Sequence, residues 1–242
     1  MGSTRKRRYS VRAPILITSI LVAALAITAA CGGDDGPSDE ELQQGLQIMV
    51  LQPDEVPEGL QSIRSEFADN AQAASGLGGG PTKEQLEAWG RLLGYSSDFQ
   101  TAEPNPASST TALSSQVTLY EDAPGADQSF TDRLARARTA DWQSSHIDLA
   151  EFQQEQLIRT LPVDDSYWIH LTGYQATSST ETRLVSDDIA IFRVGRAWGY
   201  LNVVSMGATS VSDRAFAQDT VEALLLKQIE HTKNGLESGL LD

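Results

Sequence analysis

Cysteine is almost absent from this sequence, since the 242 residues include only Cys31. A single cysteine excludes a disulfide within the sequence, so a folded domain here must be stabilised by its packed core. Basic residues are scarce too: 18 Lys and Arg stand against 33 Asp and Glu, which gives a formal net charge of −15. Such an acidic surface repels phosphate backbones, so we expect no nucleic acid partner.

Signatures of catalysis and metal binding are also missing. The sequence contains no G-x-S-x-G elbow of the hydrolases, no H-E-x-x-H zinc motif and no EF-hand calcium loop. The glycine-rich stretch GGGPTKEQ lacks the P-loop spacing, because Lys83 follows Thr82 instead of preceding it. Neither a reaction nor a cofactor is therefore predicted from a motif.

The three histidines, His146, His170 and His231, lie far apart in the sequence. His146, with Asp148 and Glu151 close by, is the best candidate for a metal or acid–base cluster. A polar lead-in to a helix explains the same residues equally well. We expect His170 to be a packed strand residue and His231 to lie in the last turn of the final helix, where a positive charge suits the helix dipole.

Two pairs of neighbouring carboxylates, Asp164-Asp165 and Asp187-Asp188, fall at the ends of expected strands. A general acid and base must face one cleft in unlike environments, which neighbours in sequence do not supply by themselves. At a turn or a strand edge they would instead oppose pairing with a strand of another molecule. We expect this second role, and an extracytoplasmic hydrolase using scattered acids and a histidine is an alternative function.

Positive charge gathers at the N-terminus. Five of the 18 basic residues precede Ala13, and no acidic residue precedes Asp34, so from Cys31 onward the charge balance is 13 − 33 = −20. Residues 13–30 carry no charge, which completes the basic and apolar pattern of a secretory signal peptide over residues 1–30. A transmembrane helix is the alternative, but the run reaches only about 18 residues and contains Pro14, whereas a span needs roughly 20 apolar residues.

The residues that end this run, ITAAC from Ile27 to Cys31, resemble the lipobox of bacterial lipoproteins. The resemblance implies cleavage between Ala30 and Cys31, a diacylglycerol on the Cys31 sulfur and an N-acyl chain on the new N-terminus. It implies a protein of the cell envelope, lipid-anchored on the outer side of the cytoplasmic membrane. Two or three acyl chains anchor a protein durably, whereas one holds it only marginally. Ordinary cleavage to a soluble secreted protein is the alternative.

After the cysteine, the stretch GGDDGPS has the composition of a flexible tether, so residues 31–38 form the lipidated cysteine and its linker. Fully extended, the stretch spans roughly 25 Å at ~3.5 Å per residue, which keeps the next domain close to the membrane. Residues 39–235 are expected to form one extracytoplasmic domain, followed by a C-terminal tail over residues 236–242. Ser38 and Glu41 predict a capping box at the start of its first helix.

Hydrophobic periodicity predicts the elements of this domain. Helical spacing of apolar residues predicts helices over residues 39–50, 83–93, 122–142, 148–161 and 212–235. Alternation and aromatic or β-branched content predict strands over residues 60–67, 95–100, 115–121, 166–177, 180–194 and 197–207. The expected fold class is α+β, with an antiparallel sheet of about five to six strands and helices packed on it.

Three phrases of the domain, DEVPEGL, GRLLGY and IFRVGRAWGYLNVVS, are similar to small exported bacterial lipoproteins whose domain has a PsbP-like α+β fold. The likeness spans residues 40–232, and its motifs are structural. It implies a non-catalytic binding, sensing or scaffolding role at the cell envelope and transfers no active-site residue.

Aromatic residues gather on the last three expected strands. Most should lie in the core, but some could face solvent beside arginines and bind a protein or a small molecule. The candidates for this surface are Trp168, His170, Arg193, Arg196, Trp198 and Tyr200. The predicted function is therefore a non-catalytic binding, sensing or scaffolding domain whose partners are the membrane, through the anchor, and an unidentified ligand. A purely structural envelope protein is a further alternative.

The anchor is testable through Cys31. When a bacterial host expressing the chain is fed a radioactive fatty acid, the membrane fraction should contain labelled protein, because the acyl chains are attached at this residue. Cys31→Ser should abolish the label and release the protein from the membrane. Label that persists on the variant would rule out anchoring at this cysteine.

Overall fold

The computed structural model describes residues 37–75, 80–102, 110–146, 148–176, 182–207 and 211–241. The predicted signal peptide, Cys31 and most of the Gly76–Gly80 loop lie outside the described residues. Residues Gly36–Asp242 form one compact unit, and all the residues of its described core lie between Leu46 and Leu241.

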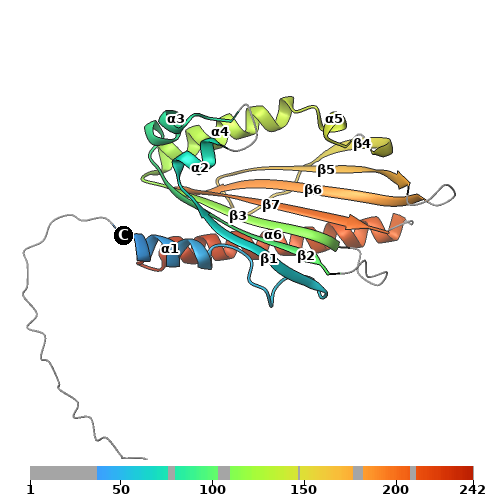
Figure 1. Ribbon diagram of the computed structural model, residues 1–242, viewed down its shortest axis with the longest axis horizontal. Coiled ribbons are helices and arrows are strands. Elements are labelled where there is room, and N and C mark those ends of the chain that lie inside the picture. Colours follow the sequence, from blue (N-terminus) through green and yellow to red (C-terminus); the bar gives the residue numbers. More distant parts are fainter. Residues whose placement is uncertain are drawn as a thin grey trace, which may run out of the picture. The chain divides into compact units, whose positions relative to one another are not determined.

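A seven-stranded antiparallel sheet forms the centre of the unit, with strand order β1-β2-β3-β7-β6-β5-β4 (Figure 1). The strands are β1 (Leu60–Ala68), β2 (Arg91–Thr101), β3 (Thr110–Tyr120), β4 (Leu149–Leu157), β5 (Asp165–Ala176), β6 (Thr182–Val194) and β7 (Ala197–Met206). The predicted meander of three long strands is confirmed as β5, β6 and β7, which pair in sequence order. The fold class is α+β as expected, but the sheet has seven strands where five to six were predicted.

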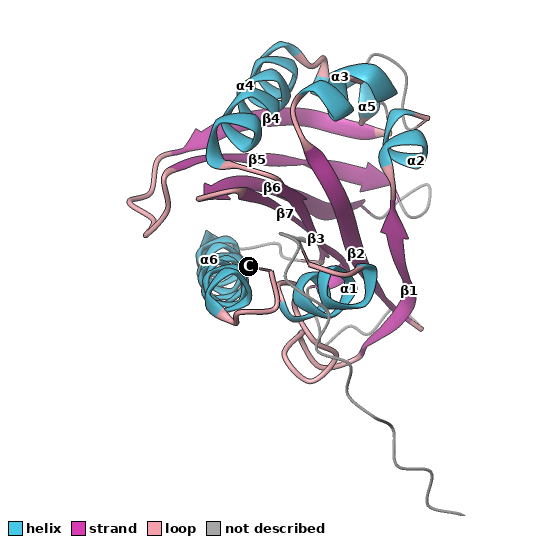
Figure 2. Ribbon diagram, turned by 90° about the vertical axis from the view of Figure 1, so that its left-hand side faces the viewer, coloured by secondary structure: helices cyan, strands magenta, loops and turns pink. Residues whose placement is uncertain are grey.

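Helices cover both faces of the sheet, as the end-on view in Figure 2 shows. The helices are α1 (Asp39–Ile48), α2 (Asn70–Ala74), α3 (Lys83–Ala88), α4 (Ala123–Thr139), α5 (Trp142–Ser145) and α6 (Val211–Glu237). α1 and α6 lie on one face, and α2 to α5 lie on the other. Among the described helices, none combines the length and apolar character that crossing a membrane requires.

Each face of the sheet buries its own apolar cluster. On the α6 side, Phe192, Leu201 and Leu225 belong to the largest cluster, and on the α4 side Phe130 and Ile191 belong to another. A third cluster joins α1 to the end of the chain, where Leu241 packs beside Gly45. The described part of the predicted tail, residues 236–241, is therefore packed against the domain through Leu236, Leu240 and Leu241.

Local signals at helix starts are confirmed. Ser38 and Glu41 form the predicted capping box of α1, since the Ser38 hydroxyl accepts from the Glu41 backbone and the Glu41 carboxylate accepts from the Ser38 N–H. Thr82 and Gln85 form an equivalent box at α3. These pairs satisfy backbone donors that the first helical turn leaves free.

The helix predicted over residues 148–161 is wrong, because this segment is the edge strand β4. Its register against β5 shifts between Ala150 and Gln153, and Glu151 adopts a left-handed conformation with φ of 52°. This bulge shifts the two-residue alternation, because Ala150 and Gln153 are three positions apart and yet pair with Tyr174 and Thr172, which share one face of β5. The spacing of apolar residues along this segment therefore resembles the spacing expected of a helix.

The helix predicted over residues 83–93 also ends too late. α3 stops at Ala88, Gly90 turns the chain with φ of +66°, and β2 begins at Arg91. Leu93 pairs with Leu119 of β3, so its partner is distant in the sequence. The apolar pair Leu92-Leu93 therefore belongs to a strand that only long-range pairing stabilises.

Phe192 tests the larger core cluster. Its ring is fully buried and lies over Gly199 of β7, where a Cβ would come within 2.3 Å of the ring. Phe192→Ala should lower the free energy of unfolding by about 3–5 kcal/mol, because it leaves a cavity. Urea unfolding measures this loss, and Ile63→Ala, at a side chain that is 62% exposed, should change stability by less than about 0.5 kcal/mol. Equal losses in the two variants would contradict this core.

Candidate functional site

Strand pairing divides the predicted binding surface between the two faces of the sheet. Trp168 pairs with Ala190, and Trp198 pairs with Arg193. Because residues 190 and 193 of β6 are three apart, their side chains point to opposite faces. Trp168 accordingly lies in the cluster on the α6 side and Trp198 against the cluster on the α4 side. The six candidate residues therefore do not form one surface.

On the α6 side, Trp168 and His170 are buried and share one acceptor. The indole Nε1 of Trp168 donates to Oδ1 of Asp188 at 2.9 Å, and Nδ1 of His170 lies 2.9 Å from the same oxygen. Asp188 is only 1% exposed and lies within β6, which has β5 and β7 as neighbours. The prediction that Asp187 and Asp188 occupy a turn or a sheet edge is wrong, because β6 is an internal strand.

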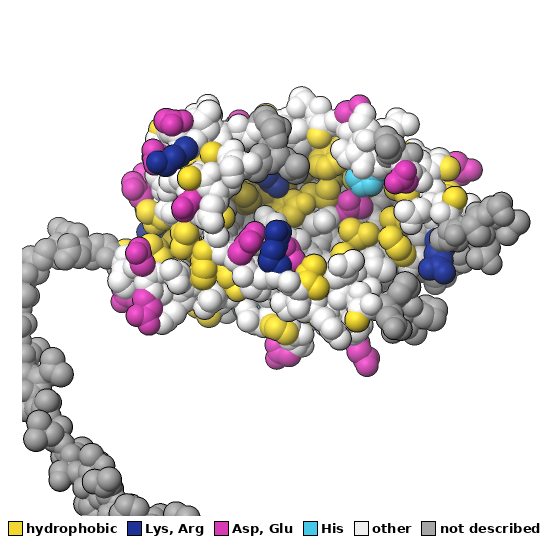
Figure 3. Space-filling view, in the orientation of Figure 1, with side chains coloured by type: hydrophobic (Ala, Val, Ile, Leu, Met, Phe, Trp, Pro, Cys, Tyr) yellow, Lys and Arg dark blue, Asp and Glu magenta, His cyan; other side chains and the backbone are white. Residues whose placement is uncertain are grey.

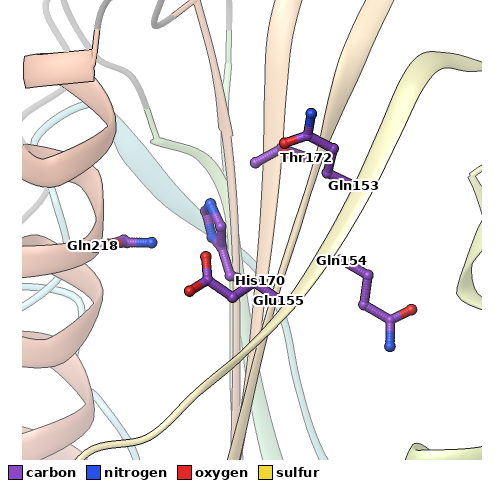
Figure 4. Close-up of a pocket in the computed structure, with 6 residues that line it drawn as sticks. All are labelled: Gln153, Gln154, Glu155, His170, Thr172 and Gln218. Atoms are coloured by element: carbon purple, nitrogen blue, oxygen red, sulfur yellow. The ribbon is translucent and has the colours of Figure 1, made fainter.

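A polar pocket of about 520 Å³ opens beside His170. Its lining consists of Gln153, Gln154, Glu155, His170, Thr172 and Gln218. Glu155 and His170 are register partners on β4 and β5, and Figure 4 shows Gln218 of α6 pointing towards them. All six lining residues have polar or charged side chains, so the pocket suits a small polar molecule.

On the α4 side, His146 contacts a carboxylate far away in the sequence. Its Nε2 lies 3.1 Å from Oδ2 of Asp187 in β6, and Asn202 donates to the same carboxylate. The cluster predicted around His146 with Asp148 and Glu151 does not form a metal site. Within the described ranges, no group of three or more His, Cys, Asp or Glu side chains could hold a metal ion.

The contacts of the three histidines among the described residues show no activated nucleophile. His231 was expected in the last helical turn, but α6 continues to Glu237 and His231 bonds to Glu55 at 2.9 Å. Among the described residues, no serine or threonine hydroxyl hydrogen-bonds to an imidazole. His146 and His170 also lie on opposite faces of the sheet, so they cannot act in one site.

A larger cavity of about 610 Å³, which we call the sheet cavity, lies between the sheet and the helices on the α4 side. Strands β1, β2, β3, β6 and β7 contribute to its lining, and so do α2, α3, α4 and α5. Figure 3 shows the hollow on this side of the molecule, with apolar side chains at its bottom. A cavity bordered by so many elements has a shape that the fold itself maintains.

Apolar and aromatic side chains form most of the lining of the sheet cavity. The aromatic ones are Tyr120, Trp142, Trp198 and Tyr200, and the aliphatic ones include Leu86, Ile189 and Ile191. The Tyr120 hydroxyl donates to the Ser129 hydroxyl at 2.5 Å and accepts from the Trp198 indole at 2.9 Å. Burial raises the pKa of Tyr120, so its hydroxyl stays protonated at neutral pH.

Two arginines of the predicted surface have structural partners instead. Arg193 lies between Asp127 of α4 and Asp164, each at 3.3 Å. Arg196 donates to the carbonyl oxygens of Glu121 and Leu241. Both side chains therefore connect neighbouring segments of the domain.

Arg133 belongs to the sheet cavity but was not among the predicted residues. It is three residues after Phe130 and four before Ala137, which pack in the same core cluster, so helical spacing places it on the same face of α4. A cation on the inner face of an amphipathic helix is a signal that the sequence did contain. What it contacts depends on where α4 lies over β7, which the sequence does not reveal.

Comparisons with known proteins identify few similarities. No protein-family model matches the chain, and no curated protein matches it. One solved structure is similar, the extracellular domain of PknH from Mycobacterium tuberculosis, at 9% identity over 84% of this chain and 100% of that chain, with a TM-score of 0.41. No functional conclusion follows from a likeness of this degree, and the resemblance to PsbP-like lipoproteins stays a prediction.

The buried carboxylate of Asp187 predicts a pH dependence of stability. Burial is the main cause that raises the pKa of Asp187 in the folded protein. The folded state therefore holds this proton more tightly than the unfolded state, so the associated stability is present below the unfolded pKa and is lost as the pH rises through the folded pKa. Asp187→Asn removes this titration and keeps the shape of the side chain.

Urea unfolding at pH values from about 4 to 5.5 measures this effect below the usual pKa range of histidine. The free energy of unfolding of Asp187→Asn, relative to the wild type, should rise with pH over that interval. Taking the difference cancels the titration of the other carboxylates. A difference that stays constant or falls over the interval would contradict the raised pKa.

Proposed function

We propose that this protein is an exported, lipid-anchored binding protein that holds a small molecule in the sheet cavity without transforming it. The main support for this proposal is the cavity itself, which has a volume of about 610 Å³ and is lined mainly by apolar and aromatic side chains. Sites for small ligands have volumes of about 300–1,000 Å³ and combine such walls with a few polar groups. The side chains of Arg133, Tyr200 and Ser129 provide polar groups of this kind.

The cellular place of the protein is proposed from its N-terminal sequence. Basic residues followed by the uncharged run up to Ala30 support export, and the ITAAC sequence supports a lipid on Cys31. The described domain begins with Ser38 capping α1, so only a short linker separates it from that cysteine. A domain held in this way would meet its ligand at the outer surface of the cytoplasmic membrane.

Binding without catalysis is favoured over a hydrolase. The hydrolase alternative depends on His146 or His170 with nearby acids, and each imidazole does lie beside a carboxylate, Asp187 or Asp188. A hydrolytic site also needs a nucleophile or an activated water that meets the base in one cleft. The two pairs are on opposite faces of the sheet, and neither imidazole is hydrogen-bonded to a described hydroxyl.

Filling the sheet cavity tests the proposal. Ala137 of α4 lines the cavity, whereas Ala135 of the same helix is exposed and lies outside the lining. Ala137→Trp would place an indole in the cavity and should weaken binding of a neutral solvatochromic dye, such as Nile red, by about tenfold or more. Ala135→Trp makes the same change of composition on the outer face and should leave the dye affinity unchanged.

Fluorescence titration measures the affinity, and the thermal unfolding midpoint of each variant shows whether it is folded. A folded Ala137→Trp protein that binds the dye as tightly as the wild type would exclude the sheet cavity as the binding site. Loss of binding in both variants would likewise contradict the proposal, because it would place the dye elsewhere on α4.

A further inference from the structure

The charge of the sheet cavity is opposite to that of the protein. From Cys31 onward the charge balance is −20, yet four arginines and one glutamate line the cavity. Two of the arginines have carboxylate partners: Arg64 contacts Glu66 and Asp98, and Arg136 contacts Asp132. The other two, Arg91 and Arg133, have no ion pair with any described carboxylate.

Arg91 is held by neutral groups at one part of the lining. Its side chain is buried and donates to the Asn70 side-chain oxygen at 3.0 Å and to the Ala68 carbonyl oxygen at 2.9 Å. Burial lowers the pKa of Arg91, but a guanidinium stays protonated in proteins. Hydrogen bonds to these two neutral groups therefore fix the position of the Arg91 guanidinium.

Arg133 is the less satisfied of the two cations. Its guanidinium carbon lies 5.4 Å from the ring centre of Trp198 and 5.1 Å from that of Tyr200, so it stacks above two aromatic faces. Among the described residues it has no hydrogen-bond acceptor and no ion-pair partner. A guanidinium carries five donors in a planar fork that matches a carboxylate or a phosphate.

The hydroxyl of Tyr200 adds a second free donor beside Arg133. Within the described part of the chain it makes no hydrogen bond, although Tyr200 lines the cavity. Burial raises the pKa of Tyr200 to about 12, so at neutral pH the hydroxyl carries its proton. Tyr200 is partly exposed, so its hydroxyl is accessible from the cavity and free to donate to an acceptor that a ligand supplies.

We propose that the sheet cavity binds a free single-chain amphiphile with one anionic head group, a carboxylate or a phosphate. The head group accepts hydrogen bonds from the Arg133 guanidinium and the Tyr200 hydroxyl. The apolar chain lies against Trp142, Ile189 and Ile191. This inference rests on the proposed function, because it names the chemical class of the molecule that the cavity holds.

Isothermal titration of the domain from Gly36 onward, which contains its whole described core, compares four probes below their micelle concentrations. Dodecanoate and dodecyl phosphate carry the proposed head groups, dodecyltrimethylammonium reverses the charge, and dodecyl maltoside removes it. We expect the two anions to bind at least tenfold more tightly than the other two, since hydrogen bonds to charged groups contribute that much. Comparison of the two anions distinguishes a carboxylate from a phosphate ligand.

Arg133→Met should weaken dodecanoate binding roughly tenfold to a hundredfold and leave dodecyl maltoside binding unchanged. Tyr200→Phe should weaken dodecanoate binding severalfold. The matched control is Arg138→Met, which removes a charge from an exposed position of the same helix outside the cavity lining. Arg133→Lys keeps the charge and provides a folded comparison if Arg133→Met is unstable.

Equal affinity for the anionic and cationic probes would overturn the inference, and so would unchanged dodecanoate binding in folded Tyr200→Phe and Arg133 variants. Arg133 would then serve only to pack on Trp198 and Tyr200. In that case Ala137→Trp still decides the proposed function separately, because the dye in that experiment carries no charge. If dodecanoate binds and Ala137→Trp does not weaken it, the site lies outside the sheet cavity and the inference also fails.

Discussion

The internal strand β6 must bury side chains on both of its faces, because helices cover the sheet from both sides. Neighbouring residues of this strand therefore meet different surroundings: Asp188 bonds to Trp168 and His170 on the α6 side, and Asp187 bonds to His146 and Asn202 on the α4 side. Two adjacent carboxylates in a central strand are costly to bury without partners. Hydrogen bonds from both sides make this placement possible.

The two coverings of the sheet differ in how completely they close. On the α6 side one long helix lies across β3, β6 and β7, and the Gln228 amide donates to the Gln116 carbonyl oxygen at 2.9 Å. On the α4 side four shorter helices share the same task, and the sheet cavity lies beneath them. The α6 side also has a pocket, the polar one beside His170, but the larger and more apolar sheet cavity lies under the short helices, so the capacity to bind an apolar ligand is concentrated on the α4 side.

Local chemistry could be predicted from the sequence, and contacts between distant segments could not. The Ser38–Glu41 box and the meander of β5 to β7 depend on short stretches, and both are present. The prediction for the β4 segment was wrong because the bulge at Glu151 disrupts the alternation that identifies strands. Of the candidate site, sequence alone indicated Trp198 and Tyr200, whereas their contact with Arg133 requires α4 to lie over β7.

The acidic surface of the domain and the arginines of its cavity together determine which anions we expect to bind. Outside the cavity, a charge balance of −20 from Cys31 onward repels anions, but at physiological salt this repulsion is screened beyond about 8 Å. A small anion without an apolar part would gain only a contact with Arg133 and lose its own hydration, which offsets most of that gain. An amphiphile also transfers apolar surface onto Trp142, Ile189 and Ile191, at roughly 25 cal/mol per Å². A ligand therefore gains from both the apolar walls and the free guanidinium only when it carries an apolar chain and an anionic head group in one molecule.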